Sequence, residues 1–224
     1  MPTILITGAG RGLGLELAKQ FAAAGWETLG TVRDLAKGAA MPRGSQTFLC
    51  DINDRASLAR LARDLKGKPI DVLFCNAGMY GKRKQGVGTV DYDTWAEVMR
   101  VNVFAPMACV EALVDNVAAS TRRQIVMMSS RMGSIGANTG GGEVVYRSSK
   151  AALNAVTKSL SVDLRERQMT VIAVHPGWVK TDMGGGGADL TPEQSVAGLK
   201  KVVEGLTPVS NGKFFNYDGT EIVW

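Results

Sequence analysis

The chain has 224 residues, of which 45% are apolar and 21% charged, and its formal net charge is +5. This composition is typical of a soluble globular protein, and the length suits one domain spanning residues 1–224 with a substantial core. We expect no apolar segment long enough to span a bilayer. The small basic clusters at residues 82–84 and 122–123 lack the interleaved aromatic residues of a nucleic-acid site, so neither membrane nor nucleic acid is an expected partner.

The cysteine and histidine residues do not suggest a metal site. Cys50, Cys75 and Cys109 are not spaced as metal ligands, and we interpret them as reduced, mostly buried thiols. The single histidine, His175, has no second ligand to accompany it, so a structural role is favoured. The first residues lead directly into a predicted strand, which leaves no room for a signal peptide. We therefore expect a cytoplasmic protein without a bound metal.

The first predicted element is a buried strand at residues 2–7, because this short segment is apolar and rich in β-branched residues. A glycine-rich turn follows directly at residues 7–14. Leu13, Leu17, Ala18 and Phe21 then recur at helical spacing until the helix stops near Gly25. A strand, a glycine turn and a helix in this order form half of a nucleotide-binding βαβ unit.

Strands and helices continue to alternate along the rest of the chain. We predict further strands at residues 27–32, 46–50, 71–75, 124–129, 170–175 and 213–215, and helices at residues 55–65, 92–116, 144–168 and 192–204. Such alternation predicts a single-domain α/β Rossmann fold, a doubly wound parallel sheet with helices on both faces. Ligands then bind beyond the carboxyl ends of the strands, where the motifs described here fall.

The three spaced glycines of the first turn have separate expected roles. Gly8 allows the tight turn, Gly12 lets a pyrophosphate approach the N–H groups at the helix N-terminus, and Gly14 lets the helix pack closely on the sheet. The spacing is Gly-x-x-x-Gly-x-Gly, rather than the Gly-x-Gly-x-x-Gly of the usual dinucleotide fingerprint. An ordinary glycine-rich loop is the alternative, but the position directly after a first strand favours nucleotide binding.

Tyr146 and Lys150 are four residues apart in a predicted helix and therefore share one face of it. An isolated phenol, with a pKa of about 10, is a poor acid-base catalyst at neutral pH. A lysine cation a few ångströms away would favour the phenolate and lower the tyrosine pKa toward the working range. The pair also occurs by chance on amphipathic helices, so its meaning depends on the motifs around it.

In their order, these motifs resemble the short-chain dehydrogenase/reductase family over nearly all of the chain. The family has Asn-Asn-Ala-Gly after its fourth strand, and here a cysteine replaces the first asparagine. Within the family, the ending at residues 212–224 resembles the C-factor and sniffer-type carbonyl reductases. The matching positions are the glycine turn at residues 7–14, residues 75–78, Ser130, Tyr146, Lys150, Pro176, Gly177 and Thr181.

The resemblance implies an oxidoreductase that reduces a ketone or aldehyde to an alcohol, or runs the reverse reaction, by hydride transfer. Tyr146 would give or take the proton, Ser130 would hold the carbonyl oxygen, and Lys150 would lower the Tyr146 pKa and bind the nicotinamide ribose. Asn102 would anchor a water for a proton relay; the alternative is an asparagine with only structural bonds at a helix kink. Ser130 is preferred to Ser129 because the family serine precedes x-x-Gly.

The cofactor preference is predicted from the end of the second strand. Where NAD-preferring relatives carry Asp, this chain has Val32, followed by Arg33, and Arg11 in the glycine turn is expected on the side facing the adenosine ribose. Two guanidinium groups near a 2′-phosphate favour NADP over NAD. Asp34 argues against this, since it could pair with Arg33. Asp51 resembles the residue that binds the adenine edge, and helix capping is its alternative role.

The resemblance thus implies an extended cofactor site along the carboxyl edge of the sheet. The expected cofactor-binding residues are Gly8, Arg11, Gly12, Leu13, Gly14, Arg33, Asp51, Ile52, Asn76, Ala77, Gly78, Tyr146, Lys150, Pro176, Gly177, Val179 and Thr181.

Two other functions remain open. One is a dinucleotide-binding signalling or sensor protein of C-factor type with little or no turnover. The other is a nucleotide-sugar epimerase, which normally needs a longer C-terminal region. The complete Ser, Tyr, Lys and Asn set favours an enzyme acting on a small-molecule carbonyl or alcohol. We also expect a symmetric homodimer, because the predicted helices 92–116 and 144–168 are apolar on more than one side and related enzymes pair them across a two-fold axis.

Overall fold

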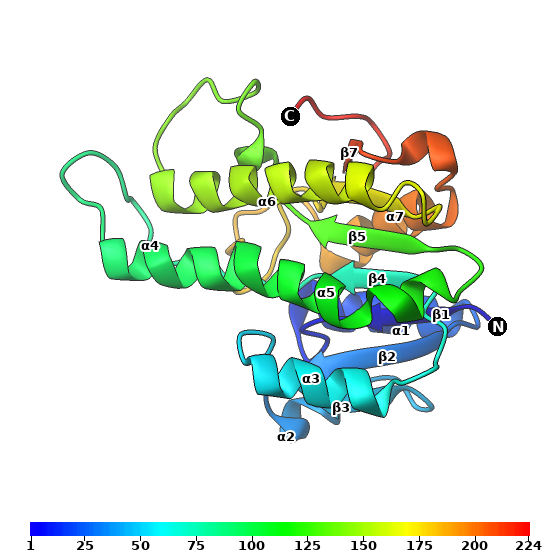
Figure 1. Cartoon of the computed structure of the whole chain (residues 1–224). Coiled ribbons are helices and arrows are strands. Elements are labelled where there is room, and N and C mark those ends of the chain that lie inside the picture. Colours follow the sequence, from blue (N-terminus) through cyan, green and yellow to red (C-terminus); the bar gives the residue numbers. More distant parts are fainter.

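Seven strands form one sheet in the order β3-β2-β1-β4-β5-β6-β7 (Figure 1). The computed structural model describes residues 1–224, and every pairing between neighbouring strands of the sheet is parallel. The strand order reverses at β1, which pairs with β2 on one side and β4 on the other. The strands are β1 (Thr3–Ile6), β2 (Glu27–Val32), β3 (Gln46–Leu49), β4 (Val72–Cys75), β5 (Gln124–Met128), β6 (Thr170–His175) and β7 (Phe214–Asn216).

The central strands are continuous apolar runs because both faces of the sheet are covered. Every residue of β1 and β4 is buried. The register places Leu5 beside Leu29 and Leu73, and Leu73 beside Ile125, so these four side chains form a row within one core. The alternate residues of the same strands contribute to the core on the opposite face.

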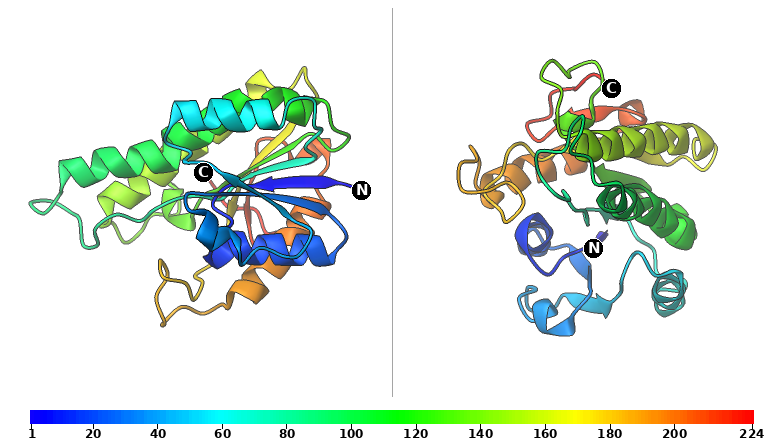
Figure 2. Two further views of the ribbon diagram at one scale, coloured as in Figure 1. Left: turned by 90° about the horizontal axis from the view of Figure 1, so that it is seen from below. Right: turned by 90° about the vertical axis from the view of Figure 1, so that its left-hand side faces the viewer.

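The helices lie in two layers, one on each face of the sheet (Figure 2). One layer packs on the core that contains Leu5 and Leu73, and the other on the core that contains Ile4 and Phe74. The predicted doubly wound parallel sheet is therefore confirmed. The first layer comprises α3 (Arg55–Asp64), α5 (Ala105–Ala118) and α6 (Val144–Asp163), and the second comprises α1 (Gly12–Ala23) and α7 (Pro192–Glu204).

The helix predicted at residues 92–116 is one helical stretch with an irregular centre. It consists of α4 (Tyr92–Met99), a π-helical turn (Arg100–Phe104) and α5. A π turn holds one more residue than an α turn, and such turns occur frequently at functional sites. The helical periodicity of the sequence does not reveal it, and Asn102 lies at its centre.

The same stretch corrects our expectation that no segment could span a bilayer. Residues Tyr92–Ala118 form a 27-residue helical run with a mean hydropathy of 1.3, which is long and apolar enough to do so by length and composition. Half of this window is buried in the fold, and α5 packs against β4 and β5 through side chains such as Cys109 and Leu113. The apolar side chains of this helical run therefore form part of one of the two cores.

A short helix absent from the sequence prediction, α2 (Leu35–Gly38), follows β2. Asp34 is its N-cap, because the Asp34 carboxylate accepts a hydrogen bond from the Ala36 N–H. Asp34 forms no ion pair with Arg33, so the pairing considered from the sequence is absent. The helix predicted at residues 144–168 also ends earlier, at Asp163.

The last residues of the chain run back along β7, the edge strand of the sheet. The Ile222 N–H donates to the Phe214 carbonyl, and the Asn216 N–H donates to the Thr220 carbonyl. The Trp224 ring stacks on Phe214 with centroids 5.5 Å apart. This segment therefore covers the free edge of the strand.

All three cysteines are buried and none forms a disulfide, as predicted. Burial raises the pKa of the Cys75 thiol to about 12, so this thiol remains protonated and unreactive at neutral pH.

Candidate active site

The glycine turn after β1 has the conformation that its glycines were predicted to allow. Gly8 and Gly12 have φ values of +70° and +54°, which side chains other than glycine rarely adopt. A Cβ on Gly12 would approach only the Thr181 methyl group, at 3.9 Å, so the space above this backbone is open. A Cβ on Gly14 would lie 2.2 Å from the Gly8 carbonyl oxygen. The sequence predicted that Gly14 lets the helix pack closely on the sheet. The structure shows that the close contact is with the glycine turn itself.

The N-terminus of α1 has no side-chain cap. Four other helices are capped by a side chain, namely α2 by Asp34, α3 by Asp54, α4 by Asp91 and α7 by Thr191. The first N–H groups of α1, including that of Leu13, therefore stay free for a ligand, and the helix dipole favours a negatively charged one. Together with the open space above Gly12, this geometry forms a cradle suited to phosphate.

The turn after β4 is tied to the glycine turn by hydrogen bonds. The Thr7 hydroxyl accepts from the N–H groups of Asn76 and Ala77, at 3.0 and 3.1 Å, and the Asn76 amide donates to the Thr7 carbonyl at 3.0 Å. The side chain of Asn76 is therefore occupied in holding the two turns together. A Cβ on Gly78 would lie 3.2 Å from Asn102 Oδ1 and 3.6 Å from Lys150 Nζ.

Asn102 is completely buried and makes three side-chain hydrogen bonds. Its Oδ1 accepts from the Met79 N–H at 2.8 Å, and its Nδ2 donates to the Met79 carbonyl at 2.8 Å and to the Ser149 hydroxyl at 3.0 Å. The amide therefore clamps the turn after β4 onto α6. These are structural bonds, and they place Asn102 beside Gly78 at the lysine. The proton-relay role of Asn102 stays a prediction.

Ser130, Tyr146 and Lys150 are brought together by β5 and α6. Ser130 follows β5 and caps the short 3₁₀ turn Arg131–Gly133, where its hydroxyl accepts from the Met132 N–H at 3.2 Å, and it lies close enough to Tyr146 to lower the pKa of that phenol. Lys150 Nζ donates to the Met128 carbonyl at 2.8 Å and lies 5.8 Å from the centroid of the Tyr146 ring. The side chains of these three residues are at least nine-tenths buried.

The direction predicted for the Tyr146 pKa is wrong for this structure. Burial raises the pKa of Tyr146, the Ser130 side chain opposes this shift, and the neighbouring Tyr80 adds to it. Burial lowers the pKa of Lys150 to about 8. Both shifts follow from the cost of placing a charge in a poorly solvated site. The lysine does not offset this cost for the phenol, because its ammonium group is directed toward Met128.

Two residues near Tyr146 were missed from the sequence. The Tyr80 ring stacks on the Tyr146 ring with centroids 4.2 Å apart. Asn154, one turn beyond Lys150, donates to the Gly133 carbonyl and accepts from Ser129, and so fastens the turn that carries Ser130 to α6. Tyr80 lies in a loop without periodicity. The spacing of four residues from Lys150 could have indicated Asn154.

The predicted ribose-side residues lie beside the glycine turn. Arg33 is exposed and forms no ion pair, whereas Arg11 pairs with Asp182 at 2.6 Å. Asp51 accepts from the Asn53 N–H, and the N-cap of α3 is Asp54, so the helix-capping alternative for Asp51 is wrong. Ile52 has its side chain in the core, so only its backbone can reach a ligand.

The turn after β6 completes the site. The Pro176 carbonyl accepts from the Ser195 hydroxyl, and Gly177 has a φ of +81°. Val179 is buried, and Thr181 approaches Gly12 across the cradle. Pro176, Gly177, Val179 and Thr181 thus lie in the segment that follows the carboxyl end of β6.

His175 is the last residue of β6, and it is not part of a group of potential metal ligands. Burial lowers the pKa of His175 to about 4, so the imidazole is neutral at physiological pH. No group of three or more potential ligands suited to a metal occurs in the structure.

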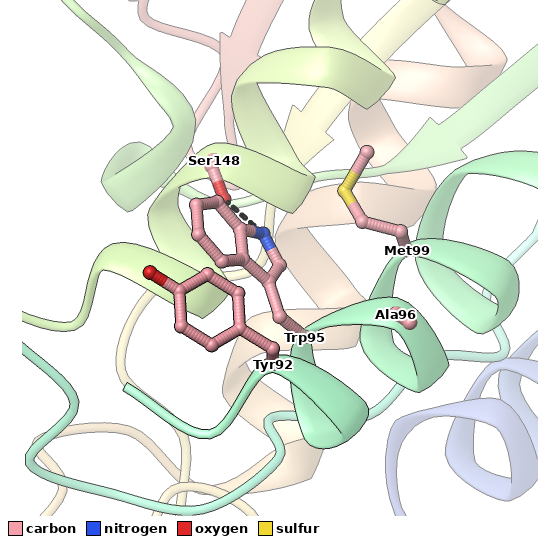
Figure 3. A pocket seen from close by; sticks show the side chains of 5 residues that line it. All are labelled: Tyr92, Trp95, Ala96, Met99 and Ser148. Atoms are coloured by element: carbon pink, nitrogen blue, oxygen red, sulfur yellow. Dashed lines mark hydrogen bonds between the residues drawn. The ribbon is translucent and has the colours of Figure 1, made fainter. Parts of the chain in front are cut away.

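A separate hollow lies between α4 and α6 and contains none of the predicted site residues (Figure 3). It is lined by Tyr92, Trp95, Ala96, Met99 and Ser148, and is largely apolar. The Trp95 indole N–H points across it and donates to the Ser148 hydroxyl at 2.9 Å.

Known proteins resemble this chain in sequence and structure. The C-signal protein of Myxococcus xanthus is 43% identical over 156 residues, which cover 70% of this chain and 93% of that protein. The carbonyl reductase Sniffer of D. melanogaster is 33% identical, with a TM-score of 0.92 and all of both chains covered. The NADPH-bound carbonyl reductase from chicken fatty liver is 30% identical, with a TM-score of 0.91 and coverage of 100% and 99%.

The sequence profile of the family described as short chain dehydrogenase matches residues 2–189. The order of motifs, the doubly wound sheet and the buried Ser-Tyr-Lys cluster agree with that match. The chain therefore belongs to the short chain dehydrogenase family.

Proposed function

We propose that the protein is an NADP-dependent carbonyl reductase, which reduces a ketone or aldehyde to an alcohol or catalyses the reverse reaction. The observation that carries this proposal is the buried cluster of Ser130, Tyr146 and Lys150, in which Lys150 follows Tyr146 by one turn of the same helix. A buried, protonated phenol is suited to donate a proton to a carbonyl oxygen. The likeness to carbonyl reductases over the whole chain supports the same reaction class.

The residues present fit a dinucleotide. The uncapped N-terminus of α1 and the open backbone of Gly12 suit a pyrophosphate. Gly78 leaves room beside Lys150, whose ammonium can reach a ribose hydroxyl. Arg11 and Arg33 are the residues that we expect near the adenosine ribose, where two guanidinium groups favour the 2′-phosphate of NADP. Arg33 has no carboxylate partner, and Asp34 is engaged as the cap of α2. NADPH bound to one of the similar reductases supports this choice.

Each proposed catalytic group has one task. NADPH, when bound, supplies a hydride to the carbonyl carbon. Tyr146 donates its phenolic proton to the carbonyl oxygen, and Ser130 holds that oxygen by a hydrogen bond. Lys150 positions the ribose and returns a proton toward Tyr146. Asn102 keeps the turn after β4 fixed against α6. We assign it this positioning role and no proton transfer of its own.

A panel of ketones and aldehydes with NADPH, followed by the loss of NADPH absorbance, tests this function. Wild-type protein should oxidise NADPH with at least one carbonyl class, and Tyr146→Phe should lower the rate by about 10²- to 10⁴-fold, the usual contribution of a general acid. Turnover that survives unchanged in Tyr146→Phe would show that another group donates the proton.

The similarity to the C-signal protein favours a second candidate, a dinucleotide-binding signalling protein with little turnover. NADPH binding by calorimetry, combined with no turnover across the panel, would favour this candidate. Measurable turnover that depends on Tyr146 would favour the enzyme.

We also propose that the protein forms a homodimer through α4, α5 and α6. Tyr92 of α4 and Phe104 of the π-helical turn between α4 and α5 expose 73% and 60% of their surface, and the apolar hollow of Figure 3 lies between α4 and α6. A second copy would bury this surface. A cytoplasmic location remains a prediction from the sequence.

A further inference from the structure

Arg83 lies close to the proposed proton donor without being part of the proposed catalytic set. Its guanidinium carbon is 4.7 Å from the centroid of the Tyr80 ring, and Tyr80 in turn stacks on Tyr146 at 4.2 Å. Arg83 is exposed and forms no salt bridge, unlike Arg55 and Arg167, which pair with carboxylates elsewhere on the surface. It therefore presents a free positive charge at the entrance beside Tyr146.

Arg147 provides a second guanidinium on the same side. It follows Tyr146 directly in α6, its Nε donates to the Gly141 carbonyl at 3.0 Å, and its Nη1 lies 3.4 Å from the Met132 carbonyl. The Tyr80 hydroxyl contacts the sulfur of this same Met132 at 3.9 Å. Arg147 also forms no salt bridge. Arg83 and Arg147 thus both border the stacked tyrosine pair, and we call them the entrance arginines.

The entrance arginines are held in place by backbone contacts that leave donors free. Arg83 Nη2 donates to the Met183 carbonyl at 2.6 Å, which links the loop after β4 to the loop after β6. A guanidinium carries five N–H donors, so one or two such bonds leave several available. A fixed guanidinium with spare donors is suited to a planar anionic group such as a carboxylate.

Glu143 is the carboxylate that acts on Tyr80 together with the entrance arginines, and one of its oxygens is already engaged. Its Oε1 accepts from the Lys84 N–H at 3.0 Å, and its Oε2 is buried without a partner. Glu143 acts electrostatically on Tyr80, as do both entrance arginines. Two cations and one anion therefore surround Tyr80, and the local charge is positive.

We propose that the entrance arginines select carbonyl substrates that carry a negatively charged group, such as a carboxylate. This inference rests on the proposed carbonyl reduction and adds the substrate class to it. The carbonyl group would lie at Ser130 and Tyr146, and the anionic group would point outward to Arg83 and Arg147. Neutral carbonyl compounds would still react, at lower kcat/KM.

Three benzaldehydes of graded charge test the inference: 4-formylbenzoate, its neutral methyl ester and the cationic 4-(trimethylammonio)benzaldehyde. With NADPH at low salt, wild-type kcat/KM should fall in that order, with about two- to fivefold between the acid and the ester, because exposed charge pairs give effects of this size. Added salt should reduce the ratio, because it screens charges. An ester that reacts as well as the acid would overturn the inference.

Variants assign the preference to the two residues. Arg83→Met and Arg147→Met should lower the acid-to-ester ratio, mainly through a higher KM for the acid, while the rate with the ester changes little. Arg63→Met, an exposed arginine on α3, is the matched control and should leave the ratio unchanged. An unchanged ratio in both variants would also overturn the inference. No turnover with any of the three aldehydes would instead overturn the proposed carbonyl reduction, and the inference with it.

Discussion

Tyr146 and Lys150 share a poorly solvated site, and burial there disfavours the charged form of each side chain. Burial raises the pKa of the tyrosine and lowers that of the lysine to about 8. Each group is therefore shifted toward its neutral form. A neutral phenol is the form that donates a proton, so the environment prepares Tyr146 for carbonyl reduction at neutral pH.

This environment predicts different pH profiles for the two reaction directions. A raised Tyr146 pKa keeps the phenol protonated to higher pH, so kcat/KM for reduction should change little between about pH 6 and pH 8. Alcohol oxidation needs the phenolate, so its kcat/KM should rise across the same range. Initial rates in both directions, followed by NADPH absorbance, measure this. An oxidation rate that falls as the pH rises would contradict the assignment.

Tyr146 and Lys150 should also differ in their effect on cofactor binding. Tyr146→Phe keeps the ring and loses only the proton, so it should abolish most turnover and leave NADPH affinity nearly unchanged. Lys150→Ala should abolish turnover and clearly weaken NADPH binding, because the ammonium also contacts ribose in our proposal. Fluorescence titration with NADPH measures both. Equal affinity in the two variants would remove the ribose role from Lys150.

Cofactor choice should depend on Arg33. We expect NADPH to bind several-fold more tightly than NADH, and Arg33→Asp to reverse much of this preference, because a carboxylate repels the 2′-phosphate and accepts hydrogen bonds from a ribose. Arg63→Asp serves as a control for the same change of charge on α3. Parallel titrations with the two cofactors decide the matter, and equal wild-type affinities would contradict the prediction.

Individual residues were predictable from the sequence where a motif fixes their place. The glycine turn, Ser130, Tyr146 and Lys150 occupy the carboxyl edge of the sheet as predicted. The direction of the Tyr146 pKa shift was not predictable. It depends on burial and on the neighbouring Tyr80, and only the folded chain brings these two tyrosines together.

At the scale of elements, the turn carrying Ser130 depends on direct backbone contact with α6. A Cβ on Gly133 would lie 2.6 Å from the carbonyl carbon of Lys150 and 2.7 Å from its Cβ. These contacts involve backbone and the base of a side chain, which cannot rotate away. The close approach therefore sets the distance between Ser130 and Tyr146.

Gly133→Ala should both destabilise the protein and slow it. Overpacking of this kind costs about 1–3 kcal/mol, and the shifted turn should move Ser130 away from the phenol and lower kcat. Gly86→Ala is a suitable control, because a Cβ there would meet no atom within 4 Å. Urea unfolding and steady-state kinetics measure the two effects. A Gly133→Ala protein that matched the control in both would disprove this role.

The predicted elements agree best where hydrophobic periodicity is strong. The strands at residues 27–32 and 170–175 and the helix at residues 192–204 have the bounds predicted. The π-helical turn Arg100–Phe104 was missed because one extra residue in a turn leaves the apolar pattern almost unchanged. The short helix α2 was missed because four residues are too few to show a period.

On the scale of the whole molecule, α4, α5 and α6 present an apolar face that the single chain leaves exposed. Phe104 and Val162 expose 60% and 49% of their surface there. If this face pairs with a second copy, light scattering at micromolar concentration should give about twice the 23.8 kDa of one chain. Phe104→Glu should shift the mass toward the monomer, whereas Val87→Glu, on an exposed loop, should not. A wild-type mass near that of one chain would refute the dimer.

The segment that follows β7 has a consequence for how copies of the molecule can associate. An uncovered edge strand offers unpaired N–H and C=O groups on which another sheet can grow. Here Ile222 and Thr220 already bond to the backbone of that strand. Strand-by-strand extension from this edge is therefore blocked by the chain itself. Trimming the last few residues should expose the edge and make the protein prone to aggregate, even if its folded core remained intact.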